Sequence, residues 1–267
     1  MAEPAMEGEG MIAEAAADTW YLFLKYARIT LRMPMWTLFG LVQPLIWLVI
    51  FGQLFSHFAR MAGFPSESYL TFLTPGIVVM TILFGSSWAG VNLLREITYG
   101  TVEKMFVTAV YRPSIVLSRV THNGVLVLLQ VGIVLAVAVA LGAQIHPGIA
   151  GLVLLVALVF GMGIGFASLS NAIALKLRRE EPLVVAGNMM TLPLMFFTST
   201  FIPRVFMPDW IAAVASVNPV HYGVEASRTI LGGQPFDGDF WLAVSVVGAF
   251  SLVALTWSMM LFMRQRE

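Results

Sequence analysis

The chain has 267 residues, of which 58% are hydrophobic and only 11% are charged, whereas about 25% of the residues in an ordinary soluble domain are charged. This excess excludes a single soluble core, and apolar runs of about 20 residues, the length of a helix that crosses a bilayer, predict an all-α membrane protein. The formal net charge is zero and cysteine is absent, so no overall field attracts nucleic acid, and disulfides, thiolate catalysis and cysteine-bound metals are excluded.

The N-terminal part of the chain is predicted to form a disordered tail followed by an interfacial helix. Residues 1–11 are acidic and lack the basic and apolar regions of a secretory signal. Over residues 12–33, polar side chains recur at the spacing of one helical face, at Glu14, Asp18, Tyr21, Lys25, Arg28 and Arg32. Apolar and aromatic residues lie on the other face, which favours the membrane–water interface. The alternative is a soluble amphipathic helix packed on a partner.

Six membrane spans are predicted within one transmembrane domain, which covers residues 12–267. They lie at residues 35–55, 71–94, 120–141, 148–175, 183–202 and 240–263. The fifth is the weakest, because Asn, Pro, Ser and Thr dilute its apolar run. No span contains Asp, Glu, Lys or Arg internally, which disfavours a proton-relay carboxylate.

The distribution of basic residues predicts the orientation of the spans. One side of the membrane would carry 12 of the 15 Lys and Arg residues, and cytoplasmic loops hold an excess of both. An even number of spans also puts both termini on one side. We therefore expect a multi-pass protein of the cytoplasmic (inner) membrane with both termini in the cytoplasm.

The connection between the second and third spans, residues 95–119, is predicted to contain a short helix on the cytoplasmic face. Thr101 could cap free amide groups at the start of this helix, and Glu103 would meet its positive end. Arg112-Pro113 would end the segment and begin the third span. Taken alone, such a helix is more often a purely structural element.

The connection between the fifth and sixth spans, residues 203–239, is too apolar to extend freely into water. We expect it to form short external re-entrant helices, which are tolerated where protein or water satisfies the backbone. Glu225 and Arg228 are spaced to pair on one helix face, and this structural role is preferred to a contact with substrate.

Both connections resemble segments of ABC-2-type permeases. The cytoplasmic one is similar to the coupling segment of that family, which has the pattern E-x-x-x-G-T-x-E followed by a basic-proline stop; the matching residues are Glu96, Gly100, Thr101, Glu103 and Arg112. The external one is similar to the family's pattern of prolines, a short helix, N-P-x-x-Y and a later arginine; the matching residues are Pro203, Pro208, Trp210, Asn218, Pro219, Tyr222, Glu225 and Arg228. The resemblance covers residues 12–263 and is greatest to small bacterial exporters of the drug and nodulation-factor type.

The resemblance implies that the chain is the membrane subunit of an ATP-driven exporter. Two copies of a separate ATPase subunit would bind ATP and Mg, because the phosphate-binding pattern G-x-x-x-x-G-K-[ST] is absent here. A second permease copy or a homologue and membrane lipids would be the other partners. No catalytic, cofactor-binding or metal-binding residue is predicted. The candidate ATPase-docking residues are Glu96, Gly100, Thr101, Glu103 and Lys104, although Glu96, like Arg95, could equally serve as an anchor at the interface. The candidate external gate consists of Pro203, Pro208, Asn218, Pro219, Tyr222, Glu225 and Arg228.

Several residues within the spans could line a transport pathway, or bond across helices, which is the commoner role. They are His122, Asn123, Gln130, Met195, Phe196, Phe197 and Thr198. The expected cargo is hydrophobic or amphiphilic: a drug-like compound, a lipid or a lipid-linked glycan. An ion-coupled secondary transporter and a non-transporting membrane scaffold are the alternatives.

Overall fold

The computed structural model describes residues 4–61, 63–107 and 110–264. All regular elements in these residues are helices. In chain order they are α1 (Pro4–Arg32), α2 (Pro34–Leu54), η1 (Ser56–Arg60), α3 (Tyr69–Thr98), α4 (Thr101–Phe106), α5 (Arg112–Ala140), α6 (Gly148–Leu177), α7 (Glu180–Phe196), η2 (Arg204–Phe206), α8 (Asp209–Ala215), α9 (Pro219–Leu231) and α10 (Gly238–Met263). The predicted all-α class is confirmed.

Four of these helices, α3, α5, α6 and α10, are long and apolar enough to cross a membrane. The two other predicted spans correspond to α2, whose described apolar stretch is Gly40–Leu54, and to α7, which has 17 residues. The count of six spans therefore stays a prediction. α7 ends at Phe196, before the predicted end of the fifth span, because the Thr198 hydroxyl donates to the carbonyl oxygen of Met195 (2.6 Å) and the chain turns there.

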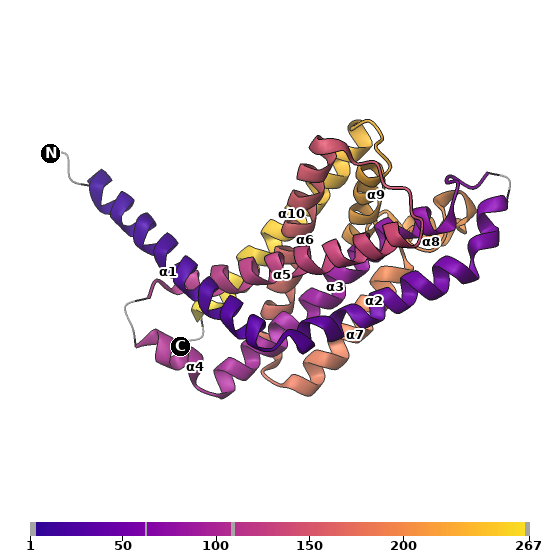
Figure 1. Cartoon of the computed structure of the whole chain (residues 1–267). Coiled ribbons are helices and arrows are strands. Elements are labelled where there is room, and N and C mark those ends of the chain that lie inside the picture. Colours follow the sequence, from indigo (N-terminus) through magenta and orange to yellow (C-terminus); the bar gives the residue numbers. More distant parts are fainter. Residues whose placement is uncertain (1–3, 62, 108–109, 265–267) are drawn as a thin grey trace.

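Helix α3 lies in the middle of the bundle and packs against α2, α5, α6, α7 and α9 (Figure 1). Leu73, Ile77 and Met80 of α3 are fully buried in the main hydrophobic core. Gly90 allows α3 to approach α6 closely, since a Cβ at this position would overlap the backbone carbonyl oxygen of Ser170. Small residues permit such close approach between helices.

The bundle has two ends, named here by the short helices that they carry. The α4 end includes α4 and the C-terminal end of α10, toward the left in Figure 1, and the opposite α9 end includes α8 and α9. Helix α1 packs along α5 at the α4 end, and its N-terminal part extends beyond the other helices.

Helix α1 begins at Pro4, so it includes residues for which a disordered tail is predicted. Ala, Met and Glu, which are favourable helix formers, make up most of residues 5–17. The predicted interfacial helix is thus part of one continuous helix of 29 residues.

Candidate functional site

The short helix α4 lies where the sequence predicts a helix, but its start differs from the expectation. The N-cap residue is Gly100, with a φ of 68°, and no side chain caps the helix. Thr101 is therefore the first helical residue, and the expected threonine cap is wrong. Glycine adopts this left-handed conformation without a steric penalty and lets the chain turn sharply from α3 into α4.

Helix α4 combines a buried anchor with exposed charges. Val102 is buried in a small hydrophobic cluster with Leu93 and Ile115. Glu103 and Lys104, both candidate docking residues, are exposed. The anchored side fixes α4 on the bundle while its charged side stays available to a partner.

Glu96, at the base of α3, contacts residues of two other helices. Its carboxylate forms an ion pair with Arg119 of α5 and accepts a hydrogen bond from the Tyr26 hydroxyl of α1 (3.3 Å). The Arg119 guanidinium also lies 5.1 Å from the centre of the Tyr26 ring, within the range of a cation–π contact. Burial raises the pKa of Tyr26, so its hydroxyl stays protonated as a donor. We name Tyr26, Glu96 and Arg119 the α1 joint.

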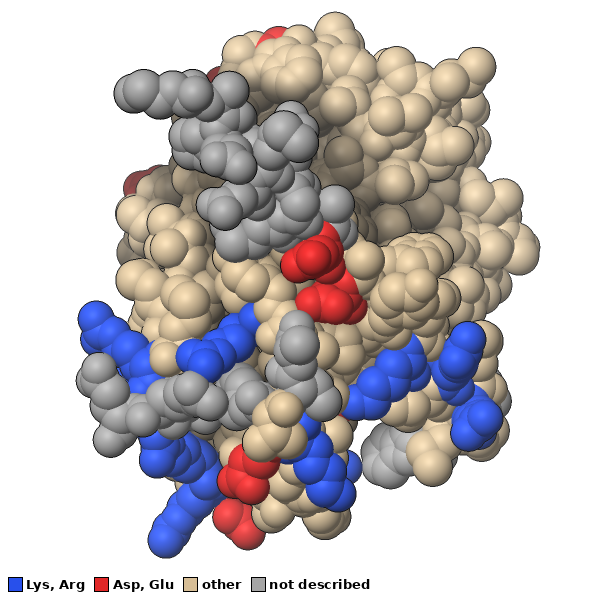
Figure 2. Space-filling view, turned by 90° about the vertical axis from the view of Figure 1, so that its left-hand side faces the viewer, with Lys and Arg blue, Asp and Glu red and all other residues tan. Residues whose placement is uncertain are grey.

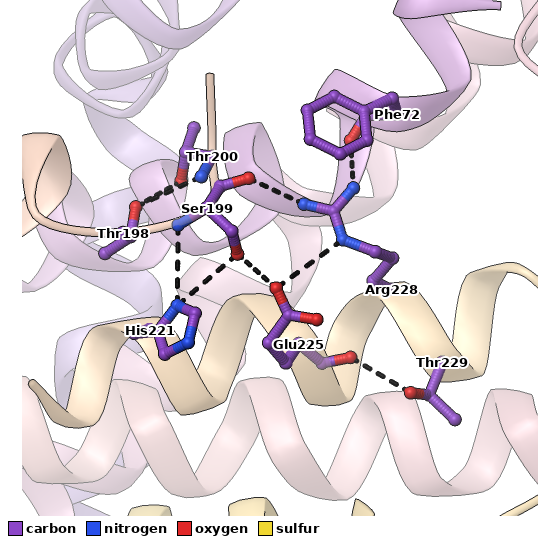
Figure 3. Close-up of polar contacts among 8 residues, drawn as sticks. All are labelled: Phe72, Thr198, Ser199, Thr200, His221, Glu225, Arg228 and Thr229. Carbon is purple, nitrogen blue, oxygen red and sulfur yellow. Dashed lines mark hydrogen bonds and ion pairs between the residues drawn. The ribbon is translucent and has the colours of Figure 1, made fainter. Parts of the chain in front are cut away.

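At the α9 end, Arg228 connects α9 to the start of α3 and to the turn after α7 (Figure 3). Its guanidinium donates to the backbone carbonyl oxygens of Phe72 (2.8 Å) and Ser199 (2.7 Å). It also lies 3.9 Å from the centre of the Phe72 ring and forms a 3.8 Å ion pair with Glu225. The predicted Glu225–Arg228 pair is therefore present, within a larger set of contacts.

His221 of α9 faces the same turn (Figure 3). The backbone N–H of Ser199 donates to His221 Nδ1 (3.4 Å), and the Ser199 hydroxyl donates to Glu225. Burial lowers the pKa of His221; nearby Glu225 opposes this shift, and Arg204 and Arg228 add to it. The geometry requires a neutral His221, because a protonated Nδ1 could not accept this bond.

The residues of the N-P-x-x-Y motif connect the end of α7 to the start of α9 by hydrogen bonds. The Asn218 side chain accepts from the N–H of Val220 (3.0 Å) and donates to the carbonyl oxygens of Leu194 (2.7 Å) and Phe197 (2.9 Å). Pro219 occupies the first turn of α9, where a missing N–H costs nothing. The Tyr222 hydroxyl donates to the carbonyl oxygen of Ser216 (2.8 Å), the C-cap of α8, so this motif ties the end of α8 to the start of α9. Pro203 and Pro208 are the N-caps of η2 and α8.

The residues proposed as pathway lining have separate surroundings. His122 contacts Thr30 of α1 (3.0 Å), and Asn123 donates to Ser86 of α3 (2.9 Å). Gln130 is buried beside Gly85 of α3. Met195 and Thr198 are also buried, Phe197 is partly buried beside Trp210, and Phe196 is 54% exposed.

The sequence did not point to Tyr26, Arg119 or Phe72 as site residues, and it suggested Ser199 only as part of the Thr198-Ser199-Thr200 run that could line a passage. Arg119 contributes to the sequence prediction only as one of the 15 Lys and Arg residues from which the orientation is derived. The sequence feature that could have revealed its role is the charge of Arg119 next to a predicted span, since a charged side chain close to the membrane interior needs a partner. Phe72 takes part mainly through its backbone carbonyl oxygen, which no sequence pattern reveals.

Comparison with known proteins decides the family. A family model described as "ABC-2 type transporter" matches residues 17–232. The chain belongs to the ABC-2 type transporter family. This permease is therefore a multi-pass membrane protein and the membrane component of a transporter.

Its relatives include named transport permeases. The putative transport permease ycf38 of Cyanophora paradoxa is 31% identical over 74% of this chain and 68% of its own length. The probable doxorubicin resistance ABC transporter permease protein DrrC of Mycobacterium tuberculosis is 24% identical over 84% and 79%, respectively. The daunorubicin resistance ABC transporter permease protein DrrB1 of Streptomyces coeruleorubidus is 26% identical over 83% and 77%.

Proposed function

We propose that this permease is the membrane subunit of an ATP-driven exporter and that a separate ATP-binding-cassette subunit docks on α4. The observation that carries the proposal is the construction of α4, which is anchored by Val102 and exposes Glu103 and Lys104. ATP and Mg would be bound by two copies of the ATPase subunit. Closure of these subunits on nucleotide would then move the ends of the spans.

The charge distribution supports a cytoplasmic location of the α4 end. Lys and Arg side chains gather on the lower half of the face at this end (Figure 2). Exposed basic residues here include Arg95, Lys104, Lys176, Arg178 and Arg179. Because cytoplasmic loops are enriched in Lys and Arg, we place both termini in the cytoplasm and count α2 and α7 as the remaining two of six spans in the inner membrane.

Exposed amide side chains on α2 and α7 support a dimer of permeases. Gln43 of α2 and Asn188 of α7 are both exposed, although they lie within apolar helices. The two helices approach each other at Trp47 and Phe196, whose ring centres are 6.3 Å apart. An unpaired amide facing lipid is costly, so a second copy, or a related permease, would cover this face. The pathway would run between the two copies.

The surroundings of this face favour a hydrophobic or amphiphilic cargo. Met189 and Met190, which follow Asn188 in α7, are exposed, as is Phe196 about two turns further along the helix, and flexible methionine side chains adapt to apolar molecules of different shape. Two of the relatives are named for resistance to doxorubicin and daunorubicin. We infer for this permease a drug-like compound, a lipid or a lipid-linked glycan.

Reversal of the charge at position 103 tests the docking role of α4. In Glu103→Arg, cargo-stimulated ATP hydrolysis should fall by about tenfold or more, because one docking charge pair becomes repulsive, while the amount of permease in the membrane stays unchanged. The measurement is hydrolysis by the reconstituted permease–ATPase complex. Glu67→Arg, at another exposed acid outside α4, is the matched control.

Two results would contradict the proposed function. One is transport that follows an ion gradient without ATP. The other is a permease that co-purifies with partners but neither transports cargo nor stimulates hydrolysis.

A further inference from the structure

The connection that contains α4 is attached to α1 on both of its sides. On the entry side, Tyr26 of α1 donates to Glu96 of α3 (3.3 Å). On the exit side, the Asp18 carboxylate accepts from the N–H of Tyr111 (2.8 Å), which is the N-cap of α5. The Ser114 hydroxyl also donates to the carbonyl oxygen of Ala15 (2.9 Å). Residues of one helix thus hold the segment before α4 and the segment after it.

Apolar packing also joins α1, α4 and α5. Val102 of α4 and Ile115 of α5 are buried in one cluster, and Leu22 of α1 and Met105 of α4 pack against it. Leu22 lies between Asp18 and Tyr26 in the sequence, one turn from each. The polar attachments and the apolar contact therefore lie along the same side of α1.

The short length of α4 determines how this arrangement would respond to force from a partner. A helix of six residues, with a glycine at its start, depends on tertiary contacts such as that of Val102 and could tilt about them when a partner pushes on it, since short helices are marginal by themselves. Helix α1 has 29 residues and spans the entry and the exit of the connection. Force on α4 then moves α1, the base of α3 and the start of α5 together.

We infer that α1 is a brace for α4, and that Asp18 and Tyr26 are positioning residues that hold α4 in the orientation the ATPase subunit needs. This inference rests on the proposed function. It gives the N-terminal helix a role in energy coupling in addition to its position at the membrane interface.

The first test measures coupling in the complete permease–ATPase complex. Asp18→Ala and Tyr26→Phe each remove one hydrogen bond, and the ratio of cargo transported to ATP hydrolysed should fall roughly threefold to tenfold, the change in equilibrium that one such bond represents. Basal hydrolysis and the amount of assembled complex should stay unchanged. Asp18→Asn keeps an acceptor oxygen for Tyr111 and should couple normally. Glu14→Ala, at an exposed acid one turn earlier on α1, is the second control.

The second test measures the brace in the permease alone. The chain contains no cysteine, so Tyr21→Cys on α1 and Val107→Cys at the end of α4, which are 71% and 86% exposed, can carry a pair of spin labels. The distribution of distances between the labels should be narrow, and it should broaden when Asp18→Ala or Tyr26→Phe is added. Asp18→Asn should leave it narrow.

The two tests separate failure of the brace from failure of the proposed function. Normal coupling in Asp18→Ala and Tyr26→Phe, together with an unchanged label distribution, would overturn the brace even if the unmodified complex is fully active. A narrow distribution that broadens in these variants, combined with no ATP-dependent transport by the unmodified complex, would overturn the role in coupling and the proposed function together.

Discussion

At Arg228, one guanidinium group donates to the carbonyl oxygens of Phe72 and Ser199 and pairs with Glu225. The sequence predicts only the pair with Glu225, because that contact is local to one helix. The two carbonyl oxygens belong to residues that lie far away in the chain, and only the folded arrangement brings them to the guanidinium. A residue proposed for the external gate is thus also a tether between three segments.

A lysine at position 228 should not replace this tether. Arg228→Lys keeps the charge but loses the planar fork that reaches both carbonyl oxygens. We expect the free energy of unfolding to fall by about 1–3 kcal/mol, the cost of leaving one buried polar group without a partner. Denaturant unfolding of the purified permease in detergent measures this free energy. Arg204→Lys, at an exposed arginine nearby, should change the free energy of unfolding little. An equal decrease in both variants would contradict the role of Arg228 as a tether.

Acidification should destabilise the turn that His221 holds. The pKa of His221 is lowered in the folded state from its ordinary value of 6.5, so below about pH 6.5 the unfolded chain binds more protons than the folded one. The contribution of His221 is therefore complete above this pH and decreases as the pH falls. Melting temperatures measured between pH 7.5 and pH 5 should decrease more steeply for the unmodified permease than for His221→Gln. Equal decreases in melting temperature for the two proteins would exclude His221 as the cause of the acid sensitivity.

At the scale of the elements, the helices follow from composition and spacing, but their ends follow from local contacts. The predicted spans at residues 71–94, 148–175 and 240–263 lie within helices that can cross a membrane, and the predicted span at residues 120–141 ends one residue beyond such a helix, α5. The fifth prediction runs past the end of α7, because Asn218 and Thr198 bond the carbonyl oxygens of Leu194, Met195 and Phe197 and stabilise a turn. Apolar composition does not reveal such bonds.

Close approach of α3 and α6 depends on Gly90. In Gly90→Ala the added Cβ overlaps the carbonyl oxygen of Ser170, so the two helices must move apart at a cost of about 1–3 kcal/mol. Gly132→Ala in α5 is the matched control, because nothing lies within 4 Å of its Cβ position and alanine favours a helix. Thermal unfolding in detergent should show a lower melting temperature for the first variant only. A decrease of the same size in both would refute the packing role.

At the scale of the whole molecule, the exposed faces are of two kinds, and the proposal of a permease dimer rests on this difference. Most of the exposed apolar side chains on α5, α6 and α10 are suited to lipid, but the α2 and α7 face also exposes the amides of Gln43 and Asn188. A sequence pattern cannot distinguish these two kinds of surface, because both are apolar helix faces on average. The exposure of Gln43 and Asn188 in the folded bundle separates them.

Cross-linking between copies tests the dimer face. Asn188→Cys introduces the only cysteine of the chain, and mild oxidation in membranes should yield a cross-linked dimer, since the residue would face a second copy. Leu252→Cys on α10, which is 66% exposed, should stay monomeric under the same conditions. A dimer band from the α10 variant alone would place the second copy on the other side of the bundle.

The sequence by itself determined that this protein is an all-α membrane protein and located α4, because apolar length and local spacing can be read directly from the chain. Its resemblance to ABC-2-type permeases, which includes the N-P-x-x-Y segment, pointed to the family that the family model then matched. Only the tertiary structure decided the partners of Glu96, Arg228 and Asn218, and the attachment of α1 on both sides of α4. These contacts join residues that are distant in the chain, often through backbone atoms. Their energy depends on geometry, which residue types alone do not specify.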